Sequence, residues 1–219
     1  MRVCGKILNV QNDVITVRVQ ADAQSWCLDH RAKTVELRLD DGRSITALQR
    51  RKIYATIRDI AEWMGDTPDA VKVYFKWGFC GDNEHEDFSL SGVDRETARD
   101  FLTYLIDFCI QNGVPCSDPL WDRCEDVERY VYACVMTRTC CITGHKNAQI
   151  HHVDRVGMGR NREQICHVGM RVVPLDPALH TMLHYQGGEE EFYQKHHITP
   201  IPLTEKMVRH LHLGRIPVT

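Results

Sequence analysis

The sequence lacks the long apolar run that a membrane-spanning helix needs. No stretch of the 219 residues approaches a length of about 18 consecutive apolar residues. The segment that follows Met1 also lacks the apolar core of a secretory signal. We therefore expect a cytoplasmic protein that has no membrane partner.

A disulfide framework is also missing, although the chain has ten cysteines. Most of them are scattered, and several lie within apolar runs. In a reducing cytosol such thiols usually behave as small buried hydrophobes. Only the adjacent pair Cys140-Cys141 has a local arrangement that could indicate a role other than burial.

An excess of positive charge is absent as well, since the formal net charge is −3. This argues against a protein that coats DNA by charge alone. The total hides an asymmetry, because residues 1–137 carry 17 Lys and Arg against 23 Asp and Glu, whereas residues 138–219 carry 10 against 7. Ten of the 12 histidines also lie in the last part. Because histidine is a common metal ligand and general base, we look for chemistry there first.

Three segments follow one another along the chain. Residues 1–46 predict a small β-sheet, with strands over 6–10 and 14–19 around a turn, and a further strand over Thr34–Leu39 that precedes an Asp41-Gly42 turn into Ser44-Ile45. Residues 47–137 predict a helical segment, and residues 138–219 carry the histidines. No internal repeat or low-complexity linker separates them. The boundary between the helical and histidine-rich segments, near residues 135–140, is therefore not sharply defined.

The helical segment carries start and stop signals. Apolar residues recur at helical spacing from Ile53 to Met64 and end at Gly65. Helix starts are indicated at Thr67-Pro68 and at Asp94. A last helix is predicted to open at Ser117-Asp118-Pro119 and to run through Cys134. Apolar stripes of this kind are usually core.

The histidine-rich segment predicts the order strand, loop, strand, helix. The strands are Gln149–Asp154 and Met170–Leu175, and the helix is Pro177–His184. Together with the upstream segments this predicts an α+β fold, with a small N-terminal β-sheet, a helical middle segment and a C-terminal ββα-metal domain.

The histidines of this unit are spaced for a metal site. Adjacent side chains on a strand point to opposite faces, so one member of His151-His152 can face a metal while the other faces the substrate. His180 and His184 are four residues apart on a helix and can hold the same ion. Alternatives to a catalytic site are a structural zinc site, a site of the same form that has lost its activity, and unrelated surface histidines.

Cleavage of a phosphodiester needs a nucleophile from water and relief of charge on the phosphate. One divalent ion, Mg²⁺, Mn²⁺ or Zn²⁺, can polarise the phosphate. A neutral histidine, with an ordinary pKa of about 6.5, can deprotonate the water. The hypothesis assigns His152 as the general base and His151, His180 and His184 as metal ligands. Three arginines of the glycine-containing loop can hold neighbouring phosphates by bidentate contacts, namely Arg155, Arg160 and Arg162.

These residues resemble the HNH endonuclease family. Cys140 to Val153 is similar to its opening knuckle and strand, and Val172 to His184 to its second strand and metal-binding helix. The stretch 151–162, His-His-Val-Asp-Arg-Val-Gly-Met-Gly-Arg-Asn-Arg, closely resembles a phage-type subgroup. In that family the first histidine of the pair binds the metal and the second is the base. The resemblance implies a DNA endonuclease used in phage recombination or replication, located in the host cytoplasm.

The chain departs from the family pattern at several positions. Thr143, Asp176 and Leu179 stand where cysteines are expected, so a four-cysteine zinc site cannot form and local stability must come from packing. Arg171 aligns near the middle Asn of the HNH name. His167 could take over the bridging role of that Asn or join the metal.

The helical segment resembles the Orf (NinB) recombination proteins. The resemblance rests on 49–54, 75–77 and 88–91. It implies single-stranded DNA binding, a homodimer, and contact with a recombinase or single-strand-binding protein. The DNA-binding residues expected here are basic ones, Arg50, Arg51 and Lys52. Further basic and aromatic residues could also stack bases and pair with phosphates, namely Lys72, Tyr74, Lys76 and Trp77. The favoured interpretation is that these side chains simply form helix faces and core. The second hypothesis is therefore a non-catalytic recombination mediator whose histidine cluster is a structural metal site.

Overall fold

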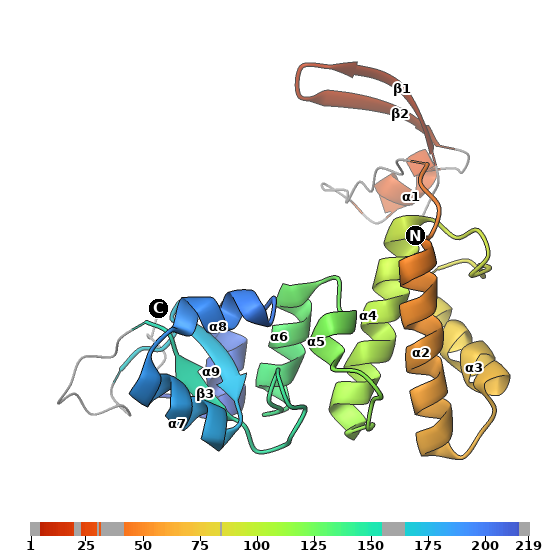
Figure 1. Ribbon diagram of the computed structural model, residues 1–219. Helices are drawn as coiled ribbons and strands as arrows, with labels where there is room; N and C mark the ends of the chain where they lie inside the picture. The colour runs from red at the N-terminus through yellow and green to blue at the C-terminus, as the bar shows by residue number, and fades with distance from the viewer. Residues whose placement is uncertain are drawn as a thin grey trace.

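The computed structural model describes residues 5–19, 23–29, 31, 42–83, 85–154 and 165–214. Helices stand side by side at one end of the molecule, a small sheet with its own helices lies at the other, and a hairpin extends from the helical end (Figure 1). This mixture agrees with the predicted α+β class. No helix in the described ranges is long and apolar enough to span a membrane. The elements are β1 (Gly5–Gln11), β2 (Val14–Val19), α1 (Ala23–Asp29), α2 (Ala47–Met64), α3 (Pro68–Asp82), α4 (Arg95–Asn112), α5 (Leu120–Arg123), α6 (Val127–Met136), β3 (Gln149–His152), β4 (Arg171–Leu175), α7 (Pro177–Gln186), α8 (Glu189–Lys195), β5 (Ile201–Pro202) and α9 (Glu205–Leu211).

The N-terminal hairpin confirms the first two predicted strands. β1 and β2 pair antiparallel, and the turn places Asn12 at a φ of 51°. The further strand predicted at Thr34–Leu39 lies outside the described residues. Ser44, predicted to follow a hairpin turn, instead forms an isolated bridge with Asp94. Helix α1 was not predicted.

Helices α2, α3 and α4 pack together around the predicted apolar stripes. Ile53, Ile57 and Phe101 are completely buried between them. The predicted caps are present: the Thr67 and Asp94 side chains accept N-terminal amides of α3 and α4. Gly65 ends α2 with a φ of 71°, a left-handed conformation that glycine adopts without strain.

The single helix predicted from residue 117 to Cys134 is wrong. The chain forms one turn, α5, and then breaks at Cys124, whose ψ is 149°. The Asp126 side chain accepts the backbone N–H of Arg129 and starts α6 anew. The break lets α5 turn toward α2 before α6 resumes.

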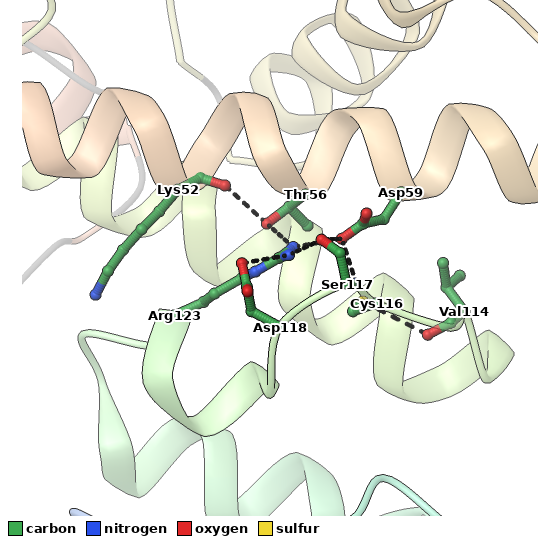
Figure 2. Close-up of polar contacts among 8 residues, drawn as sticks. All are labelled: Lys52, Thr56, Asp59, Val114, Cys116, Ser117, Asp118 and Arg123. Carbon is green, nitrogen blue, oxygen red and sulfur yellow. Dashed lines mark hydrogen bonds and ion pairs between the residues drawn. The ribbon is translucent and has the colours of Figure 1, made fainter.

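Arg123 explains why α5 takes that direction (Figure 2). Its side chain is 3% exposed, and its guanidinium lies 2.6 Å from the Asp59 carboxylate of α2. It also donates to Thr56 Oγ1 at 3.2 Å, to Ser117 Oγ at 2.8 Å and to Asp118 Oδ2 at 3.2 Å. One buried cation therefore joins α5, the loop before it and the middle of α2.

Helix α6 connects the helical end to the sheet. Its Val131, Cys134 and Val135 are completely buried, and the helix contacts α4 on one side and β4, β5 and α9 on the other. The apolar core therefore continues across residues 137 and 138. The boundary placed there, between a segment 47–137 and a domain 138–219, remains a prediction.

The C-terminal sheet is antiparallel in the order β3-β4-β5. His151 pairs with Val173 and His152 with Val172, which confirms the two predicted strands. Helix α7 follows β4 as predicted, and Asp176 caps it by accepting the amide of Ala178. The later elements α8, β5 and α9 were not predicted.

Candidate active site

The ββα unit brings three of the predicted histidines together. His151 of β3 is 0% exposed. Its ring centre lies 5.0 Å from that of His180 and 5.1 Å from that of His184, both on α7. One nitrogen from each ring lies within 4.8 Å of the others, and within the described ranges this is the group whose side chains could hold a metal ion.

The spacing of the two α7 histidines fits one ion. Nε2 of His180 and Nε2 of His184 are 3.0 Å apart. Two nitrogens bound at about 2.1 Å to one zinc ion lie about 3.0 to 3.4 Å apart for angles of about 90 to 109°. The pair therefore already has the separation of two ligands.

His151 has the character of a third ligand. Neither of its ring nitrogens has a hydrogen-bond partner among the described residues. Burial lowers the pKa of His151, although the nearby Glu189 carboxylate opposes this. A buried neutral imidazole with unused nitrogens is the form that binds a metal, so the residues present fit a divalent ion.

Gln149 fixes the orientation of His180. Its side-chain Oε1 lies 2.5 Å from Nδ1 of His180. An amide oxygen only accepts, so Nδ1 carries the proton and Nε2 keeps its lone pair for an ion. Sequence reasoning missed this residue, although its place two positions before His151 puts both on one face of the strand.

His152 points away from the group of three and contacts His167. Nε2 of His152 lies 3.0 Å from Nδ1 of His167, and His167 is buried. His167 was predicted either to bridge or to join the metal, and the structure places it beside His152. The two faces of β3 thus carry two separate histidine groups, as the strand alternation predicted.

Asp154 and Arg171 close the base of the loop between the strands. The Asp154 carboxylate accepts the backbone N–H of Arg171 at 2.7 Å and Nη2 at 2.8 Å. These hydrogen bonds lower the pKa of Asp154. Arg171, which the resemblance placed near the middle Asn of the HNH name, therefore ties the end of β3 to the start of β4. The loop residues Arg155, Arg160 and Arg162 lie outside the described residues.

Residues 140–144 form a turn although Thr143 stands where the resemblance predicts a cysteine. Cys140 is buried, and its sulfur accepts the Thr143 amide at 3.4 Å. Asp176 lies 3.2 Å from Nδ1 of His145, and Leu179 packs against the core. Packing and these two contacts hold this turn, as expected for a chain in which a four-cysteine site cannot form.

The DNA-binding residues predicted in the helical segment, residues 47–137, fall into two kinds. Arg50 donates to the carbonyl oxygens of Leu90 at 2.9 Å and Ser91 at 3.0 Å, so much of its guanidinium holds a loop. Arg51 is exposed and Lys52 is half-buried. Exposed aromatic side chains on α3, by contrast, do not belong to the core: Tyr74 is 60% and Trp77 is 75% exposed.

Comparisons with known proteins agree with this geometry. No curated protein and no solved structure matches the chain. The family HNHc_6, described as "Putative HNHc nuclease", matches residues 17–214. The match includes the helical segment as well as the ββα unit, so the family is not confined to the C-terminal third. Since it covers most of the chain, the protein belongs to this HNH nuclease family.

Proposed function

We propose that the protein is a metal-dependent endonuclease that cleaves DNA phosphodiester bonds. The observation that carries this proposal is His151, a fully buried histidine whose ring nitrogens form no hydrogen bond within the described residues and that faces His180 and His184. On the opposite face of the same strand, His152 is supported by His167. A structural zinc site alone would not require this second pair.

The roles follow from the two faces of β3. His152 is the general base that takes a proton from the attacking water, and His167 holds its ring by the 3.0 Å contact. His151, His180 and His184 hold the divalent ion. When bound, that ion supplies charge stabilisation to the phosphate and the leaving oxygen. Three protein ligands leave coordination positions for substrate, as a catalytic site requires.

Replacement of one ligand tests the metal site. His184→Ala is expected to lower the affinity for zinc by more than about hundredfold, since loss of a direct ligand should exceed the effect of an outer partner. The affinity is measured by competition with a chromophoric chelator. Cleavage of supercoiled plasmid with Mg²⁺, Mn²⁺ or Zn²⁺, and its loss with chelator, tests the activity. His197→Ala, which changes an exposed histidine outside the group, is the control. Equal zinc affinity in the two variants would contradict the ligand assignment.

We propose further that the helical segment, residues 47–137, binds single-stranded DNA in a phage recombination or replication pathway. Tyr74 and Trp77 present aromatic faces beside a shallow hollow on α3. Nearby lysines are already paired, Lys72 with Asp69 at 2.6 Å and Lys76 with Asp87 at 2.8 Å. Base stacking rather than phosphate contact would therefore carry the binding, with a weak dependence on salt.

Trp77→Ala is expected to weaken binding of a fluorescent single-stranded oligonucleotide by about 1–3 kcal/mol, the contribution of one stacked base. Fluorescence anisotropy of the full chain measures it. Val73→Ala is the matched control, because Val73 lines the same hollow but has no ring. If both variants bind as tightly as the wild type, α3 is not the DNA surface. A protein occupant, either a recombinase or single-strand-binding protein or a second copy of the chain, is then tested by light scattering and pull-down.

A further inference from the structure

We propose that Glu189 is a positioning residue of the metal centre and holds the buried ring of His151. The inference rests on the proposed metal site and adds a residue that neither the sequence motif nor the histidine group contains. It concerns the ring nitrogen of His151 that does not bind the ion.

A neutral imidazole that binds a metal through one nitrogen carries a proton on the other. His151 is 0% exposed, so water cannot accept that proton. A buried N–H without an acceptor is costly. The site therefore needs an acceptor beside His151, and neither ring nitrogen has a hydrogen-bond partner among the described residues.

The Glu189 carboxylate is placed to be that acceptor. Its Oε1 lies 3.4 Å from Nε2 of His151, and the side chain is 37% exposed. The distance exceeds that of a formed N–H···O bond, about 2.7 to 3.2 Å, so a small torsion of this partly exposed side chain must close it. With the proton on Nε2, Nδ1 of His151 is left for the ion.

The backbone brings Glu189 to this position. Gly187 and Gly188, which join α7 to α8, have φ angles of +67° and +76°. A side chain is strained in such conformations, and glycine is not. This turn makes Glu189 the first residue of α8 and directs it toward β3, next to the ligands on α7.

The same arrangement already exists at His180. Gln149 accepts from the Nδ1 of His180 and leaves Nε2 for the ion. Glu189 would do the same for His151, with the difference that a carboxylate also raises the basicity of the ligand and balances the charge of the ion. Glu189 is not itself in the group of atoms within 4.8 Å of one another, which favours a positioning role over direct ligation.

The test is zinc affinity of the full chain, measured by chelator competition on the wild type, Glu189→Ala, Glu189→Gln and Glu190→Ala. We expect Glu189→Ala to bind zinc about 10- to 100-fold more weakly. Glu189→Gln keeps an acceptor oxygen and should recover part of the loss. Glu190→Ala is the matched control, an exposed carboxylate in the same first turn of α8, and should bind as the wild type does.

Three results would overturn the inference: wild-type affinity in Glu189→Ala, an equal loss in Glu190→Ala, or a loss in Glu189→Gln as large as in Glu189→Ala. The last would indicate a direct carboxylate ligand. Thermal unfolding without zinc shows whether α8 is intact in each variant, and cleavage by Glu189→Ala should recover at saturating metal. If the wild type binds no zinc, Mn²⁺ or Mg²⁺, the proposed metal site itself fails, which is a different result from equal binding by all four proteins.

Discussion

His152→Ala is expected to reduce the rate of DNA cleavage by about 10²- to 10⁴-fold, the usual contribution of a positioned general base. The variant should still bind metal, because His152 lies on the face of β3 opposite to His151 and contacts His167 instead. It should also fold, since its ring is only half-buried. Single-turnover cleavage of plasmid DNA, together with zinc titration of the same preparation, separates loss of the base from loss of the metal.

His167→Ala is the companion variant. It removes the contact that holds the His152 ring but keeps the ring itself, so a smaller loss of rate is expected than in His152→Ala. If His152→Ala cuts as fast as the wild type, the general base has been assigned to the wrong residue. If it loses zinc as well, the division of roles between the two faces of the strand is wrong.

Arg123→Ala is expected to destabilise the protein by about 3–5 kcal/mol, because it leaves a buried charge without its partner. Asp59 is 11% exposed and lies 2.6 Å from the guanidinium. The variant also removes donors to Thr56 and Ser117. The free energy of unfolding, from urea titration followed by circular dichroism, measures the loss.

An exposed ion pair provides the comparison for Arg123. Arg209 lies 3.5 Å from Glu205, and both side chains are more than half exposed. Solvent screens such pairs, so Arg209→Ala is expected to cost at most about 1 kcal/mol. The two losses should therefore differ clearly. Equal losses in the two variants would show that the Arg123 ion pair contributes no more than a surface pair.

The parts of the fold that local chemistry determines could be predicted from the sequence. Thr67-Pro68, Asp94 and Gly65 mark helix ends through hydrogen bonds within a few residues, and the structure has those ends. The β1–β2 hairpin and the ββα order also follow from local alternation and spacing. The grouping of His151 with His180 and His184 could be predicted for the same reason, since residues on a strand and on one helix turn have their relative directions set by periodicity.

What the sequence could not show depends on contacts between distant segments. The break between α5 and α6 is set by Arg123 reaching Asp59, 64 positions earlier in the chain. Arg50 resembles a DNA contact in sequence but donates to carbonyls some 40 positions away. Gln149 and Glu189 belong to the site only because of the ring that each one faces.

Helix α6 packs against both the helical end and the C-terminal sheet, so the two parts of the protein are not independent modules. Its buried face contributes to the helical core through α4 and to the C-terminal sheet through β4 and β5. The ββα unit is therefore not a cassette that can be transplanted by cutting after residue 137, because that cut would leave Val131 and Val135 exposed in one piece and the sheet uncovered in the other. The two halves should melt in one cooperative transition, and a ligand that stabilises the helical half should raise the melting temperature of the C-terminal half with it.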